Sequence, residues 1–243
     1  MRTVVSACFV VIMLASVALA QKDKPWTEWT KKDVDKTLND SAWGQTQLET
    51  DDTPAPNESA VTQVAAPRSA DRQLSRNGES GEAKPVKYVK YSVRFLSAKP
   101  VRAAFARTVL LAKADADENL TSQLQSFVDR DFSEYIVVSV GVEVGDPKMG
   151  APIMKVFSEA TAEAIQQNVY LERKDGKKLF LMDYRPPVED GMGAKFVFKR
   201  VVDGQPFLGQ NDSVRFVANF NDKMKLSTRY KVSEMIYDGK VEY

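Results

Sequence analysis

The stretch that decides the fold is YIVVSVGVEV, at Tyr135–Val144. Every second residue from Ile136 onward is Ile or Val, and no charged residue occurs between Tyr135 and Val142. A strand that is apolar on both sides is typical of the middle of a sheet, where both faces are covered. We therefore expect residues 135–144 to form the central strand of the domain.

The sequence on either side predicts further strands and three helices. Tyr91, Val93 and Phe95 alternate with polar residues, which is typical of a half-buried strand. Apolar residues at helical spacing predict helices over residues 100–113, 118–129 and 151–166. C-terminal to these we expect antiparallel strands over residues 169–173, 178–184, 195–201, 214–220 and 225–232, and a closing hairpin at 237–240.

These elements predict an α+β fold. About eight short strands with spaced turn signals indicate a mainly antiparallel β-sandwich-like domain, with two or three inserted helices, over residues 86–243. Phenylalanines alternate with polar residues in the C-terminal strands, so we expect them in the core: Phe196, Phe198, Phe207, Phe216 and Phe220.

Residues 1–20 have the pattern of a cleaved signal peptide. Arg2 precedes a largely apolar stretch over residues 4–17, and Ala18-Leu19-Ala20 is a small-residue cleavage site. The pattern predicts export, to the periplasm or the medium, with no membrane span left after cleavage. The only cysteine, Cys8, lies inside this segment, so the mature chain has no disulfide, which favours a bacterial source.

The composition excludes several chemistries. The chain has no histidine, which removes Ser-His and Cys-His nucleophiles and His-ligated metal sites. Cleavage after residue 20 removes Arg2 and no acid, so 33 basic residues face 33 acidic ones, and this balance argues against a nucleic-acid partner. We find no glycine-rich phosphate loop and predict no cofactor and no metal.

All three tryptophans lie in residues 21–44. Thr30 and Asp33 fit a capping box, and the following residues carry a narrow apolar stripe, which predicts a short helix that has to dock on something. We predict a partner-binding segment consisting of Trp26, Trp29, Val34, Leu38 and Trp43. The alternative is that the segment packs back on its own domain. Residues 45–85 contain no aromatic residue and are rich in polar residues and proline, so we expect a disordered linker there.

Two groups of acidic residues are weaker site candidates. Asp115, Asp117 and Asn119 match the first ligand spacings of a calcium loop, but the required glycine and glutamate are missing, so capping of the following helix is the simpler interpretation. Glu189 and Asp190 lie in a Pro/Gly loop and are candidates for the acid pair of a glycoside hydrolase.

The segment Lys24-Pro25-Trp26-Thr27-Glu28-Trp29, ending in Ser41-Ala42-Trp43, resembles the start of a group of uncharacterised exported bacterial proteins. Some members of that group are related to proteins named for a Gly-Trp-x-Thr-Asp segment, which this chain lacks. Residues 134–144, 170–187 and 235–243 are similar as well, and together the similar stretches cover about a third of the chain. The resemblance implies export and a non-catalytic role.

The sequence therefore favours a non-enzymatic exported protein that binds or scaffolds a component of the bacterial cell envelope, a protein or a polymer, with the tryptophan-rich helix as a tethered docking segment. The alternatives are a carboxylate-based hydrolase of envelope glycans and, third, a calcium-stabilised adhesion module.

Overall fold

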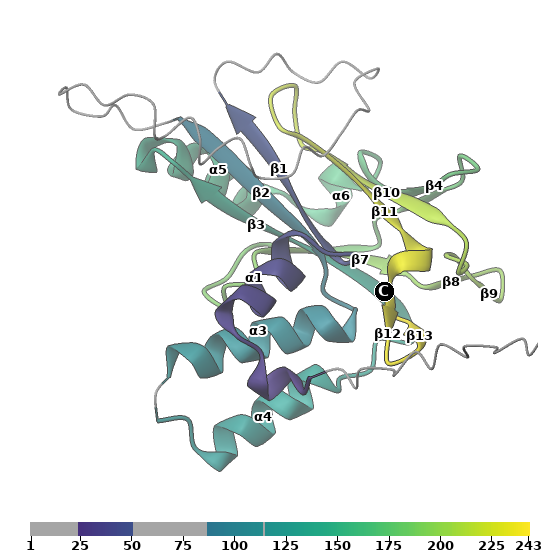
Figure 1. Cartoon of the computed structure of the whole chain (residues 1–243). Helices are drawn as coiled ribbons and strands as arrows, with labels where there is room; N and C mark the ends of the chain where they lie inside the picture. The colour runs from purple at the N-terminus through teal and green to yellow at the C-terminus, as the bar shows by residue number, and fades with distance from the viewer. Residues whose placement is uncertain (1–23, 51–86, 114) are drawn as a thin grey trace, which may run out of the picture.

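Two antiparallel sheets form the body of the domain (Figure 1). The computed structural model describes residues 24–50, 87–113 and 115–243. The main strands are β1 (Gly44–Thr50), β2 (Tyr88–Phe95), β3 (Tyr135–Val144), β4 (Val169–Arg173), β5 (Lys178–Phe180), β6 (Asp183–Arg185), β7 (Ala194–Lys199), β10 (Ser213–Asn219) and β11 (Lys225–Lys231). Sheet A has the order β1-β2-β3-β7-β6, and sheet B has the order β11-β10-β4-β5. The predicted α+β class with mainly antiparallel strands is confirmed.

The core lies between the two sheets and is rich in aromatic rings. The Phe196 ring of β7 is 5.4 Å from the Phe216 ring of β10, and the Phe95 ring of β2 is 4.9 Å from the Tyr230 ring of β11, centroid to centroid. Both pairs therefore join sheet A to sheet B. Four of the five phenylalanines predicted for the core are buried, and Phe220 is half-buried against the same cluster.

A helical layer covers the other face of sheet A. It consists of α1 (Lys31–Asn39) and α3 (Lys99–Ala112), with α4 (Glu118–Val128) packed on α3, and the three helices gather on one side in Figure 1. β3 is the middle strand of sheet A, and both Val138 and Val137 on its opposite faces are buried, as predicted. The expectation that β2 is half-buried is wrong, because α1 and α3 also cover its polar side, where Ser92 and Arg94 are buried.

The predicted linker over residues 45–85 is wrong for its first six residues. They belong to β1, which pairs with β2 along its whole length, from Gly44 opposite Arg94 to Thr50 opposite Tyr88. Backbone pairing with β2 orders this polar segment, and polar side chains suit a strand at the edge of a sheet. Residues 51–86 lie outside the described residues, and so does the predicted signal peptide.

The two sheets are connected at both edges. On one edge, the side-chain amide of Gln47 in β1 donates to the Lys225 carbonyl and accepts from the Ser227 N–H of β11, at 2.8 and 2.9 Å. On the other edge, the strand expected over residues 178–184 is divided between the sheets. The Leu181 N–H donates to a carbonyl of β4, whereas the Met182 N–H donates to a carbonyl of β7. Residues 178–180 and 183–185 consequently belong to different sheets.

The third predicted helix is shifted and broken. It consists of α5 (Pro147–Glu159) and α6 (Ala162–Ile165). Asp146 caps α5, which begins at Pro147, four residues before the expected start, and the backbone is extended at Ala160, where α5 ends. Thr161 then caps α6. The remaining short elements are η1 (Trp26–Glu28), η2 (Val232–Glu234) and two hairpins, β8 (Val201–Val202) with β9 (Gln205–Pro206), and β12 (Ile236–Tyr237) with β13 (Lys240–Val241).

Within the described ranges, no helix has both the length and the apolar character that crossing a bilayer requires.

Candidate functional site

Three of the five predicted partner-binding residues are buried in the chain's own fold. Val34 and Leu38 of α1 are 3% and 7% exposed and belong to the main core. Trp26 is 7% exposed among side chains of α3 and α4, and its indole N–H donates to the Gln125 side chain at 3.0 Å. The prediction that these three residues contact a partner is wrong. The segment packs on its own domain, which was the alternative interpretation.

The other two, Trp29 and Trp43, are half-buried and lie together at the surface. With residues of the C-terminal hairpin they line a hollow of about 360 Å³. We call it the aromatic hollow, and its lining residues are Lys24, Trp29, Asp33, Trp43, Ile236 and Tyr237. The sequence did not mark Ile236 and Tyr237 as site residues, although both lie in the similar stretch 235–243 and Tyr237 begins the predicted closing hairpin.

Local hydrogen bonds place the two tryptophans. Trp29 immediately precedes the N-cap of α1, where the capping box of Thr30 and Asp33 is present as predicted. Trp43 follows a tight turn in which the Ser41 hydroxyl donates to the Thr37 carbonyl at 2.6 Å and accepts from the Trp43 N–H at 3.2 Å. The Ser-x-Trp element is therefore the turn that carries the chain from α1 into β1.

Both indole N–H groups are already used. The Trp43 indole donates to the Glu242 carbonyl at 2.7 Å, and the Trp29 indole donates to the Lys24 carbonyl at 2.9 Å. The first of these bonds joins residues that are 199 positions apart. The rings consequently offer a ligand apolar and π surface rather than hydrogen-bond donors. The ring of Trp43 lies 6.4 Å from that of Tyr237, at 85°, so these rings stand perpendicular to each other.

Asp33 supplies the negative charge of the aromatic hollow. Its Oδ2 accepts from the backbone N–H and the hydroxyl of Thr30, each at 2.8 Å. These bonds hold the pKa of the Asp33 carboxyl below its ordinary value, the backbone bond first, and the positive charges of Lys24 and Lys32 add to the effect. The carboxyl is therefore ionised at neutral pH.

The predicted acid candidates have structural partners. Asp190 is paired with Lys195 at 2.6 Å, and it accepts from the Met192 N–H at 2.9 Å. Glu189 beside it is exposed. The Asp117 side chain accepts from the Leu120 N–H at 2.7 Å, so the predicted capping of α4 is confirmed. Across the described residues, no three acidic, cysteine or histidine side chains form a metal-binding group.

A second hollow, of about 600 Å³, runs along the start and one side of α4. Its acids include Asp117, which caps the helix, and Asp129. The Asp129 carboxylate is paired with Lys99 at 2.7 Å and accepts a hydrogen bond from Gln125. Capping and pairing account for these two charges within the fold.

Two buried arginines connect the layers of the fold. Arg94 donates from Nε to the Leu38 carbonyl at 2.8 Å, and Arg102 donates to the carbonyls of Val128 and Ser97. Burial lowers the pKa of each guanidinium to about 10, so both are charged at neutral pH. Their location among apolar residues was visible in the sequence, but the carbonyls of Leu38 and Val128 lie 56 and 26 residues away from the arginines that they accept from.

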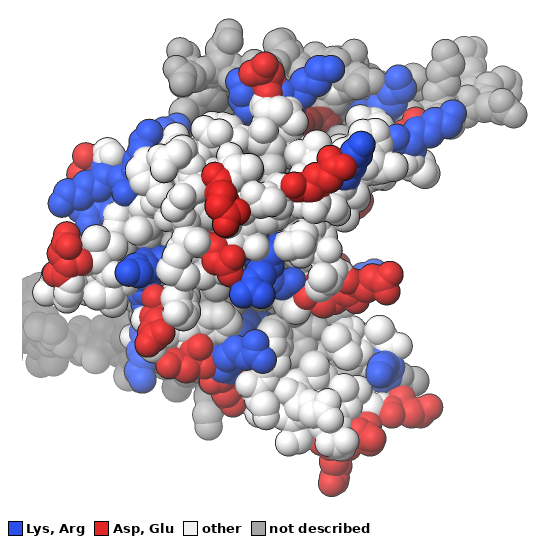
Figure 2. Space-filling model, turned by 180° about the vertical axis from the view of Figure 1, so that it is seen from behind, with Lys and Arg blue, Asp and Glu red and all other residues white. Residues whose placement is uncertain are grey.

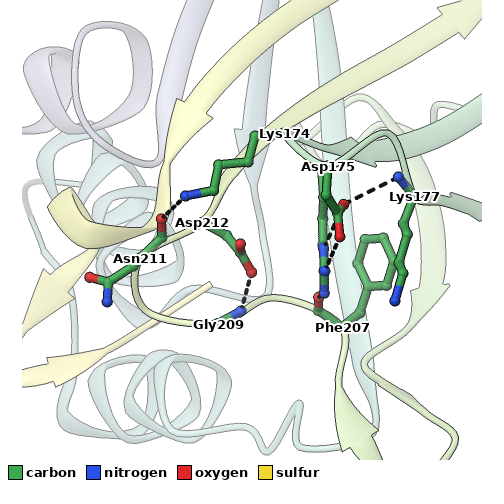
Figure 3. A network of polar contacts seen from close by, with 8 residues as sticks. Lys174, Asp175, Lys177, Phe207, Gly209, Asn211 and Asp212 are labelled. Atoms are coloured by element: carbon green, nitrogen blue, oxygen red, sulfur yellow. Dashed lines mark hydrogen bonds and ion pairs between the residues drawn. The ribbon is translucent and has the colours of Figure 1, made fainter.

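The polar network in Figure 3 joins two loops. Arg173 pairs with Asp175 in the β4–β5 turn and donates to the Phe207 carbonyl at 3.0 Å. Lys174 donates to the Asn211 carbonyl at 3.2 Å (Figure 3). These bonds fix residues 207–211 against sheet B. Figure 2 shows one face of the molecule, on which basic and acidic side chains are intermixed.

In comparisons with known proteins, no family model, no curated protein and no solved structure matches this chain.

Proposed function

We propose that this chain is an exported, non-enzymatic binding protein of the bacterial cell envelope, and that the aromatic hollow is its contact surface. The observation that carries the proposal is that two of the three tryptophans are half-buried around one hollow while the third is buried. Half-buried, pre-positioned aromatic rings are typical of binding hot spots, because a ligand can cover a large area without ordering flexible side chains.

Export is supported by the signal-peptide pattern of residues 1–20, and a bacterial source by the absence of cysteine after Cys8. A non-enzymatic role is supported by the partners of the acidic residues, since Asp190 pairs with Lys195 and Asp117 caps α4. The binding segment of this proposal is not a tethered helix. It is a fixed part of the domain, with Trp43 bonded to Glu242 and Trp29 placed by the capped start of α1.

Ile236→Glu tests the proposal. Ile236 lies at the aromatic hollow and is 39% exposed, so a charge there alters the contact surface without entering the core. Val201→Glu is the matched control. Val201 is 44% exposed and also lies in a two-residue strand whose hairpin closes with an Asp-Gly turn.

Each tagged variant is crosslinked in the envelope of its own bacterium and purified, after far-UV circular dichroism has shown that it is folded. We expect the crosslinked product of the wild type to be lost in Ile236→Glu and kept in Val201→Glu. An unchanged product with Ile236→Glu, or no product with the wild type, contradicts the proposal.

A further inference from the structure

We propose that the ligand of the aromatic hollow is an organic cation of the quaternary-ammonium type, with the trimethylammonium group as its recognised part. This inference rests on the proposed function and names the chemical class of the ligand.

The aromatic walls are the first reason. Trp29, Trp43 and Tyr237 line the same hollow, and the rings of Trp43 and Tyr237 are 6.4 Å apart and stand at 85° to each other. The face of an aromatic ring carries partial negative charge and attracts a cation, and tryptophan is the strongest of the aromatic residues in this respect. Several aromatic rings lining one site are the feature by which proteins recognise methylated ammonium groups.

The hydrogen bonds of the indoles are the second reason. An oxygen acceptor of a peptide or a sugar can hydrogen-bond to a tryptophan side chain only through a free indole N–H. Here the N–H of Trp29 is bonded to the Lys24 carbonyl and that of Trp43 to the Glu242 carbonyl. A trimethylammonium group has no hydrogen-bonding atom and requires only ring faces and a counter-charge.

The counter-charge is the third reason. Asp33 is at the hollow, and both hydrogen bonds from Thr30 end on its Oδ2. The other oxygen, Oδ1, accepts no hydrogen bond from the described residues. Lys24 also lines the hollow, and its positive charge acts on the Asp33 carboxyl. A ligand cation would replace the exposed Lys24 side chain as the positive charge near Asp33.

The size of the hollow agrees with a small ligand. Its volume of about 360 Å³ lies near the lower end of the range for small-molecule pockets, roughly 300–1,000 Å³.

The test uses the three indole signals of the ¹⁵N-labelled protein in solution NMR. Choline is titrated against its uncharged carbon isostere, 3,3-dimethylbutan-1-ol. We expect choline to shift the Trp29 and Trp43 signals in a saturable way, while the signal of Trp26, which is buried and does not line the hollow, stays in place. Equal shifts with the uncharged isostere, or no saturable shift with choline, overturn the inference.

Two variants of α1 test the counter-charge. Asp33→Asn removes the charge and keeps an oxygen that accepts the Thr30 bonds, whereas Asp35→Asn removes an exposed charge of the same helix that does not line the hollow. We expect choline affinity to fall roughly fivefold in Asp33→Asn, as loss of a close counter-charge at an exposed site implies. Asp35→Asn should leave the affinity unchanged. Equal effects of the two variants contradict the role of Asp33.

A vesicle arm identifies the source of the cation. If the protein cosediments with phosphatidylcholine vesicles and free choline inhibits the cosedimentation, the ligand is a lipid headgroup. If choline shifts the indole signals but the protein does not cosediment, the ligand is a free solute. Failure of this inference is distinguishable from failure of the proposed function. If choline causes no shift but Ile236→Glu still abolishes the crosslink, the hollow binds a partner of another chemistry.

Discussion

Replacement of Leu38 by alanine tests whether α1 is part of the cooperative fold. Leu38 is 7% exposed and belongs to the main core, and the substitution removes three carbon atoms from that core. At about 0.8 kcal/mol per buried CH₂ group, the transfer loss is about 2.4 kcal/mol, and the cavity left behind adds to it. We expect the free energy of unfolding to fall by about 3 kcal/mol. For a domain of this size that lowers the Tm by about 6–12 °C.

Chemical denaturation followed by far-UV circular dichroism is the assay, because this signal reports the sheets and helices of the whole domain. Leu111→Ala is the control, since Leu111 is 43% exposed at the end of α3 and its truncation should cost less than about 0.5 kcal/mol. If Leu38→Ala moved the transition no further than Leu111→Ala, α1 would not belong to the unit that unfolds, and the reasoning would be refuted.

Three further substitutions have defined outcomes in the same denaturation assay. A Cβ atom at Gly44 would lie 2.4 Å from the Leu38 carbonyl oxygen, so Gly44→Ala should lower the free energy of unfolding by roughly 1–3 kcal/mol. Gly150→Ala is the control, because its Cβ atom would make only an ordinary van der Waals contact, and it should leave the stability unchanged or increase it. Burial raises the pKa of Glu49 in the folded protein, so the charged carboxylate destabilises the fold. Glu49→Gln should therefore increase the free energy of unfolding at neutral pH. This gain should disappear as the pH falls from above the raised pKa of the folded state to below the ordinary pKa of the unfolded state. Thr30→Ala removes the cap of α1 and should cost about 1 kcal/mol, while Thr30→Ser should not.

The elements that were predicted best are those that depend on short-range sequence patterns. β3 has the predicted bounds, because a strand that is apolar on both faces can be recognised without knowing which strands pair with it. The capping box at Thr30 and Asp33 and the closing hairpin also depend on short-range rules and were confirmed. β1 was missed because its polar sequence carries no strand signal, and only the free edge of β2 makes it a strand.

The candidate site was predicted in part. Aromatic residues near the N-terminus were recognised as important, but their periodicity did not separate Trp26, which is buried, from Trp29 and Trp43, which line the hollow. That distinction depends on contacts across the chain, such as the bond from Trp43 to Glu242. Tyr237 was missed for the same reason, because its neighbour in space lies almost 200 residues away in the sequence.

The claim that the tryptophan segment is a fixed part of the domain can be measured directly on the unmodified protein. All three tryptophans lie between residues 26 and 43, so tryptophan fluorescence reports this segment alone, while far-UV circular dichroism reports the whole fold. Both signals are recorded in one equilibrium denaturation. If the segment is docked as described, the two transitions share one midpoint and one slope. A fluorescence transition at lower denaturant than the dichroism transition would mean that the segment detaches on its own, and the aromatic hollow would then not be a fixed site.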